Sequence, residues 1–289
     1  MPARQAVGLE SLDPALLALV LLAAGLHASW NASAKSSRDP LLAIAALTAS
    51  GGLVIGPLIF FLPAPAPASW PFLAASVALH FAYQLFLVRS YSLGDLSQVY
   101  PIARGAAPAF AAALAAWAAS EIPSLRQCLG LAITSGALFF LGSRGAGGLS
   151  SGPAVRSALV TALLISAYTV VDGLGVRRAG DPFSYIVWMA LLDAFPILAV
   201  GLWVRRGRTV EFLRNEGWRA AAGGIVAMLG YAIVLWVMSQ GAIAVVAALR
   251  ETSVVFAALL GWLLLGEPFG RRRVLASVAL VAGLVLVQL

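Results

Sequence analysis

Two arginines stand deep inside long apolar runs of this sequence. Arg104 and Arg250 lie about seven and eight residues from the start of their runs, about 10–12 Å into a helix that rises 1.5 Å per residue. A guanidinium keeps its charge and only donates hydrogen bonds, so it needs a carboxylate, water or carbonyl groups. Such arginines suit the binding of an anionic group such as a carboxylate. The alternatives are salt bridges that lock the molecule, or side chains that reach the headgroups.

Two carboxylates could complement these arginines. Asp193 lies in the middle of another apolar run, and Glu251 follows Arg250 directly. Neighbours on a helix point about 100° apart, so Glu251 need not pair with Arg250. Either carboxylate could pair with an arginine, attract an amine or carry a transported proton, and ion pairing is the commonest of these outcomes. Asp172, beside Arg177 and Arg178, is expected to be structural.

A polar stripe follows one apolar run, because His27, Asn31 and Lys35 are spaced by four residues and Trp30 stands beside them. His80, Tyr83 and Gln84 form a second such patch. Facing the interior, these side chains would line a pathway, and helix–helix hydrogen bonding is an equally good interpretation. Aromatic residues that could stack on a substrate, or else form interfacial belts, are Tyr168, Trp188, Tyr231 and Trp236.

The elements that carry these residues must be membrane-spanning helices. The 289 residues are 61% hydrophobic and 11% charged, with a mean hydropathy of +0.92, whereas soluble domains carry roughly 25% charged residues. The apolar runs are about 20 residues long and do not alternate, which favours helices over barrel strands. The ten predicted spans are Pro14–Lys35, Pro40–Leu62, Trp70–Tyr91, Ser97–Ala119, Arg126–Ser143, Ala154–Val176, Pro182–Val204, Trp218–Ser239, Ala242–Leu265 and Val274–Leu289. Pro101 and Pro108 predict that the fourth span is broken around Arg104.

The sequence gives little support for a metalloprotein, an enzyme, an ATP-driven pump or a nucleic-acid-binding protein. Cys128 is the only cysteine, and the two histidines lie on different spans, so no metal site and no cofactor is predicted. No GxSxG or GxxxxGK[ST] sequence is present, so we predict neither an enzyme nor an ATP-driven pump. The basic residues sit in short turns, which indicates membrane topology and not nucleic-acid binding.

The chain repeats itself. A shift of 146 residues lays Arg104 on Arg250, Glu121 on Glu267 and Arg126 on Arg272, all rare residue types here. A shift of 142 lays Asp39-Pro40 on Asp181-Pro182. We therefore predict an all-α fold with two five-helix modules, residues 1–145 and 150–289. Since five is odd, the modules should be inverted in the membrane, as in many secondary transporters.

The basic residues also predict an orientation. The odd-numbered loops hold 13 lysines and arginines and the other face holds 4, while Arg104 and Arg250 lie within spans. Under the positive-inside rule, the odd loops are cytoplasmic and both termini are outside.

The second half resembles a known family. The segment Leu249-Arg-Glu-Thr-Ser-Val-Val-Phe-Ala-Ala-Leu-Leu-Gly-Trp-Leu-Leu-Leu-Gly-Glu267 is similar to the signature of EamA-type carriers of the drug/metabolite transporter superfamily. Tyr100-Pro-Ile-Ala-Arg-Gly-Ala-Ala-Pro108, through Glu121, looks like the first copy. Ser253-Val254 stands where many members carry proline. The resemblance implies ten spans, transport of an unspecified metabolite and cytoplasmic termini, the last opposing the charge tally.

We expect a multi-pass protein of the cytoplasmic (inner) membrane that carries a small anionic or zwitterionic solute by alternating access, with a proton as a candidate coupling ion. The alternative is a scaffold or lipid-binding protein that transports nothing. The partners are the substrate and the lipid bilayer, with no nucleic acid, and the sequence sets no oligomeric state. The candidate substrate-binding residues are Arg104, Arg250, Glu251, Asp193, His27, Trp30, Asn31, Tyr83, Gln84 and Tyr231.

Overall fold

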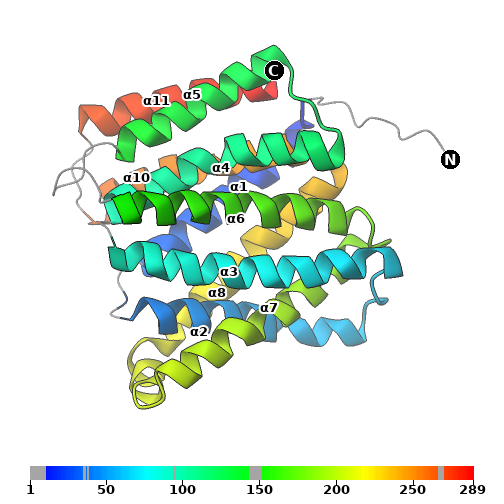
Figure 1. The fold of residues 1–289 in the computed structure, drawn as a ribbon, viewed down its shortest axis with the longest axis vertical. Coiled ribbons are helices and arrows are strands. Elements are labelled where there is room, and N and C mark those ends of the chain that lie inside the picture. Colours follow the sequence, from blue (N-terminus) through cyan, green and yellow to red (C-terminus); the bar gives the residue numbers. More distant parts are fainter. Residues whose placement is uncertain (1–10, 35–36, 38, 94–95, 143–151, 266–269) are drawn as a thin grey trace.

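Long helices make up the chain in a computed structural model, and the residues that it describes contain no strand (Figure 1). The description covers residues 11–34, 37, 39–93, 96–142, 152–265 and 270–289. The α-helices are α1 (Pro14–Ala34), α2 (Pro40–Ile55), α3 (Trp70–Leu93), α4 (Leu96–Ala119), α5 (Leu125–Gly142), α6 (Gly152–Val176), α7 (Pro182–Val204), α8 (Thr209–Gln240), α9 (Ile243–Leu249), α10 (Ser253–Leu265) and α11 (Arg271–Gln288). Short 3₁₀ turns are η1 (Gly56–Phe60), η2 (Pro67–Ser69) and η3 (Arg250–Thr252).

Two helices begin with the same local chemistry. Asp39 caps α2, its carboxylate accepting a hydrogen bond from the amide of Leu42 at 3.3 Å. Asp181 caps α7 and accepts from the amide of Ser184 at 3.0 Å. A proline follows each aspartate and occupies the first helical position, where its missing N–H costs nothing. The repeated Asp-Pro pair therefore starts a helix in each half of the chain.

The helices follow the predicted spans, with three differences. α8 begins at Thr209, nine residues before the predicted Trp218. The predicted break in the fourth span is wrong, since α4 continues through Pro101 and Pro108. Helices α5 and α6 pack along α4, and such surroundings let membrane helices tolerate proline. The interruption lies instead in the ninth span, where η3 separates α9 from α10.

This is a multi-pass membrane protein. Within the described ranges, eight helical segments are long and apolar enough to cross a bilayer. α1 has a shorter apolar stretch, Pro14–Trp30, and α11 begins with three consecutive arginines. Large apolar side chains face outward, as lipid contact requires, and Phe60, Phe61 and Trp117 are each more than 80% exposed.

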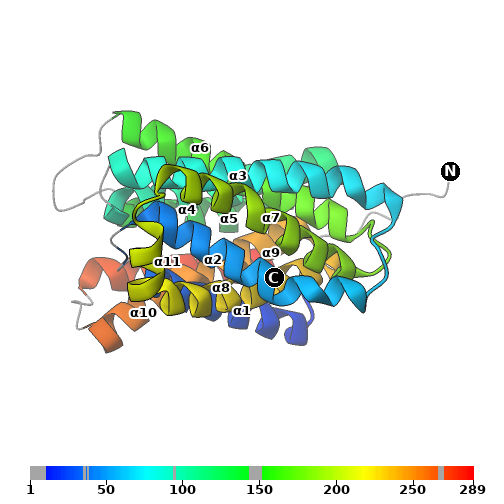
Figure 2. The same ribbon diagram turned by 90° about the horizontal axis from the view of Figure 1, so that it is seen from below.

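The helices pack in a regular set of pairs. α5 lies beside α11 on one side of the bundle, while α2, α7 and α8 lie on the opposite side (Figures 1 and 2). α4 contacts α6 and α10 contacts α1, while α3 contacts α6 and α8 contacts α1. Small residues allow the closest approaches, because a β-carbon on Gly51 of α2 would lie 2.7 Å from the carbonyl oxygen of Gly224 in α8. Together these pairs surround a space in the middle of the bundle.

Candidate functional site

A cavity of about 700 Å³ occupies the centre of the bundle. Its lining includes Tyr231 and Arg250, in the middle of the helical bundle, and continues to Pro40 and Arg273, where α2 and α11 begin. It therefore reaches the end of the molecule that carries the odd-numbered loops. The volume is in the range that holds a small metabolite.

Most of the predicted substrate-binding residues line this cavity. They are His27, Trp30, Tyr83, Gln84, Arg104, Asp193, Tyr231 and Arg250. Glu251 is 1% exposed and lies behind the wall. Asn31 belongs to α1, but its side chain lies outside the described residues, as do Lys35 and Glu267.

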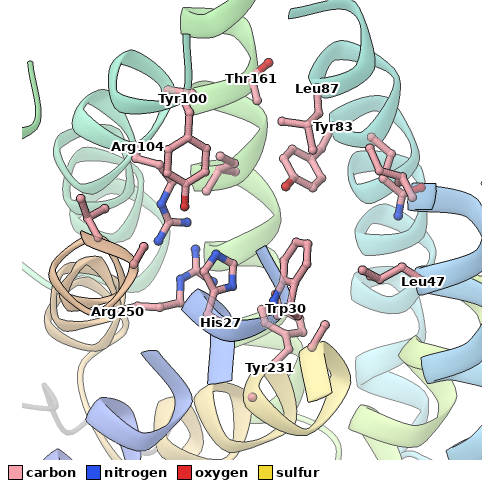
Figure 3. Close-up of a pocket in the computed structure, with 18 of the residues that line it drawn as sticks. His27, Trp30, Leu47, Tyr83, Leu87, Tyr100, Arg104, Thr161, Tyr231 and Arg250 are labelled. Carbon is pink, nitrogen blue, oxygen red and sulfur yellow. The ribbon is translucent and has the colours of Figure 1, made fainter. Parts of the chain in front are cut away.

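The two arginines lie on one side of the cavity. Figure 3 shows Arg104 and Arg250 pointing toward the same space, with the ring of His27 beside Arg250 and the hydroxyl of Tyr100 near Arg104. Arg104 is 3% exposed and Arg250 is 5% exposed. We call this side, made of Arg104, Arg250 and Glu251, the basic pole.

Only one of the two arginines is neutralised by an ion pair. Arg104 Nε lies 2.9 Å from Glu251 Oε2, and an Arg104 amino group donates to Ser253 Oγ at 3.3 Å. Across the described part of the chain, Arg250 forms no ion pair, and its Nε has no hydrogen-bond partner. Both neighbours lie in the 3₁₀ turn η3, where Glu251 pairs with Arg104 while Arg250 points into the cavity. One guanidinium charge is thus left for a ligand.

An acidic pole, formed by Asp193, Asp172, His80 and Gln84, comes from α3, α6 and α7. Asp193 is 8% exposed, and its Oδ2 accepts a hydrogen bond from Gln84 Nε2 at 3.3 Å. Its other oxygen, Oδ1, has no hydrogen-bond partner. Asp193 lines the cavity, so this oxygen is placed to meet a ligand or a proton.

Asp172, expected from the sequence to be structural, is tied to the cavity wall. It is fully buried and accepts hydrogen bonds from the hydroxyls of Tyr185 at 2.9 Å and Tyr231 at 2.6 Å. His80 Nε2 lies 3.9 Å from Asp172 Oδ2. Asp172 lies one turn before the end of α6, and this position near a helix terminus was the reason to expect a structural role. No spacing in the sequence indicates that Tyr185 and Tyr231 donate hydrogen bonds to it.

Aromatic rings cover the wall between the poles. His80 stacks on Tyr168 with ring centroids 4.0 Å apart, and Tyr168 lies edge-on to Tyr83 at 5.4 Å and to Tyr231 at 6.1 Å. The candidate substrate-binding residues chosen from the sequence do not include Tyr100, Tyr168 and His80, although His80 was assigned to a polar patch and Tyr168 to the possible stacking residues. Spacing could also have indicated Tyr100, because it precedes Arg104 by one helical turn.

The opposite end of the bundle is closed by a cluster of bonds around Arg177. Its guanidinium lies 2.8 Å from Glu121 Oε1 and donates to the carbonyl oxygens of Met238 at 2.9 Å and Gly241 at 2.5 Å. Glu121 also accepts from the amide of Ala244 at 3.3 Å. This cluster, which we call the end lock, joins α4, α6, α8 and α9.

Metal-ligating side chains do not gather at this site: in the described ranges, no group of three or more His, Cys, Asp or Glu residues could hold a metal ion.

Comparison with known proteins agrees with this geometry. Residues 153–289 match the EamA-like transporter family. A solved structure titled "Crystal structure of protein" superimposes with a TM-score of 0.73 at 18% identity, covering 94% of this chain and 94% of that chain. That likeness shows a shared fold. Curated protein sequences gave no match.

Proposed function

We propose that this chain, whose residues 153–289 belong to the EamA-like transporter family, is a secondary transporter that moves a small anionic or zwitterionic metabolite through the central cavity. Arg250 carries this proposal. A buried guanidinium without an ion pair is costly in an apolar bundle. It is favourable where a ligand supplies the missing negative charge, and Arg250 borders a cavity large enough for one.

The proposed substrate bears a carboxylate at Arg250 and a donor group at Asp193. The basic pole holds two guanidiniums against one paired carboxylate, and the acidic pole offers an unpartnered carboxylate oxygen. An amino acid carries both complementary groups. The aromatic wall of Tyr83, Tyr168 and Tyr231 suits an apolar portion between them.

Alternating access between two modules, residues 1–145 and 150–289, is the proposed mechanism. The helix pairs support it, since α4 with α6 has its counterpart in α10 with α1, and α3 with α6 in α8 with α1. Ten spans follow if α1, α11 and the interrupted α9–α10 each cross the bilayer. The cavity reaches one end of the bundle while the end lock closes the other, as expected of one access state.

The proposal has three further parts. We propose that the chain lies in the cytoplasmic (inner) membrane and that it acts as a carrier and not as an enzyme. The acidic pole favours a proton as the coupling ion. A scaffold or lipid-binding role is the alternative. It predicts that no solute occupies the cavity, which the next experiment tests directly.

Counterflow in proteoliposomes tests the proposal. Purified protein is reconstituted, loaded with a panel of unlabelled amino acids and supplied with the same compounds in labelled form. We expect exchange of at least one compound, a more than tenfold loss in Arg250→Leu, and partial retention in Arg250→Lys because lysine keeps the charge.

The matched control is Arg156→Leu, since Arg156 is exposed near the start of α6 and does not line the central cavity. Exchange should be unchanged in this variant. Undiminished exchange in folded Arg250→Leu would remove the arginine from the mechanism. Absence of exchange for every compound would overturn the proposed substrate class.

A further inference from the structure

The acidic pole holds more negative charge than its surroundings balance. Asp193 and Asp172 are 8% and 0% exposed, and in the described structure no lysine or arginine forms an ion pair with either. Among the residues that the structure describes, His80 is the one basic side chain beside them, and its Nε2 lies 3.9 Å from Asp172 Oδ2. Two buried carboxylate charges facing one imidazole are unfavourable in an apolar bundle.

The helices packed against Asp193 differ in the titratable side chains that they bring near it. α3 presents His80 and Tyr83, α6 presents Asp172 and Tyr168, and α8 presents Tyr231. α7 itself adds Tyr185, which donates to Asp172. α2 and η1 have no ionisable side chain between residues 40 and 60. The charged groups that act on Asp193 are therefore His80 and Asp172.

The hydrogen bonds distinguish the two aspartates. Asp172 accepts from the hydroxyls of Tyr185 and Tyr231, so both of its oxygens are engaged. His80 is held at Nδ1 by the hydroxyl and carbonyl oxygens of Ser76, at 3.2 and 3.1 Å, and its Nε2 lies 3.9 Å from Asp172 Oδ2. Asp193 accepts only from Gln84, at Oδ2, so its Oδ1 is the carboxylate oxygen left without a hydrogen-bond partner.

We propose that Asp193 is a proton-binding site that couples transport to the proton gradient. The proton adds to Oδ1, the oxygen without a hydrogen-bond partner. It arrives on a hydronium ion from the cavity, an O–H bond forms, and water is left behind. Gln84 holds the other oxygen and fixes the orientation of the group. The coupling rests on the proposed transport function, whereas proton binding itself does not.

Infrared difference spectroscopy on purified protein in nanodiscs tests proton binding without a substrate. A pH titration of the wild type should show one protonated carboxyl signal that disappears as the pH rises. Asp193→Asn keeps an acceptor for Gln84 and should lose this signal. The matched control is Glu251→Gln. Glu251 is a further buried carboxylate near the cavity and is paired with Arg104, so its substitution should leave the signal unchanged.

Three outcomes overturn the proposal: a titrating signal that survives Asp193→Asn, no titrating signal in the wild type, or a signal displaced by sodium at constant pH. The coupling is tested on the amino acids that exchange in counterflow. An imposed pH gradient should drive their accumulation in the wild type. In Asp193→Asn, whatever exchange remains should no longer respond to the gradient. If the wild type exchanges none of the amino acids, the proposed substrate class is wrong. The infrared result on proton binding by Asp193 is then unaffected.

Discussion

The end lock provides a direct test of alternating access. Glu121 is 2% exposed and accepts two hydrogen bonds, from Arg177 at 2.8 Å and from the amide of Ala244 at 3.3 Å. If the bundle opens at this end, these bonds must break. Glu121→Gln removes the negative charge while keeping the shape of the side chain, so it should favour the open end.

The size of the effect follows from these contacts. A hydrogen bond to a charged group contributes about 1.5–3 kcal/mol. Arg177 is partly exposed, with 20% of its side chain accessible, so we take about 2 kcal/mol for the loss at this pair. Each 1.4 kcal/mol changes an equilibrium about tenfold, which gives a shift of about thirtyfold toward the open end.

A single cysteine reports the opening. Ala248 is fully buried between Ala244 of the end lock and Arg250 of the cavity. Ala248→Cys is placed in a Cys128→Ser background, because the native Cys128 is exposed. A water-soluble maleimide should label Ala248→Cys about thirtyfold faster once Glu121→Gln is added, as expected for a reaction that samples the open population.

The matched control lies at the other end of the bundle. The buried Asp39 forms an ion pair with the partly exposed Arg205 at 2.9 Å, and Asp39→Asn retains the helix cap. This variant should leave the labelling of Ala248→Cys unchanged. Equal labelling rates in Glu121→Gln and its parent, with both proteins folded, would refute the role of the end lock.

Three further predictions concern stability and orientation. Arg104→Leu strands the buried Glu251 and should lower the free energy of unfolding by about 3–5 kcal/mol in thermal unfolding, and adding Glu251→Gln should recover most of the loss. Gly51→Leu should separate α2 from α8 and lower the free energy of unfolding by about 1–3 kcal/mol in the same assay. Gly136→Leu should lower it little, because a β-carbon at Gly136 would meet no atom within 4 Å. The charge tally places Cys128 outside the cytoplasm, so an impermeant maleimide should label it in intact cells, and labelling only after lysis would favour cytoplasmic termini.

The sequence predicts the helices well because their causes are local. Run length in an apolar medium decides where a chain crosses the bilayer, and the run Pro182–Val204 coincides with α7. The Asp-Pro pairs contain both the cap and the first helical residue, so α2 and α7 begin where the sequence predicts. The early start of α8 was missed, since Thr209–Gly217 is too polar to look like a span.

The pairing of charges is beyond sequence reasoning because it depends on packing. Arg104 and Glu251 lie 147 positions apart in the chain, and nothing near either residue indicates the other. Ser253 offers one clue in retrospect: it replaces the proline of many family members, and its hydroxyl accepts from Arg104. The turn η3 contains neither glycine nor proline, so the sequence marks no interruption there.

Four polar contacts of the bundle share one property that bears on its motion. Arg104 with Glu251, Gln84 with Asp193, His80 with Asp172, and Glu121 with Arg177 each join the first half of the chain to the second. If the halves rock about the middle of the bundle, separations change least at the centre and most at the ends. The first three pairs, around the cavity, can then persist through the cycle and keep the two poles in place. Among these four, the pair of Glu121 and Arg177 is the one at an end, so rocking that opens this end must break it. This is why the end lock, and not the basic pole, should control access to the cavity from this end.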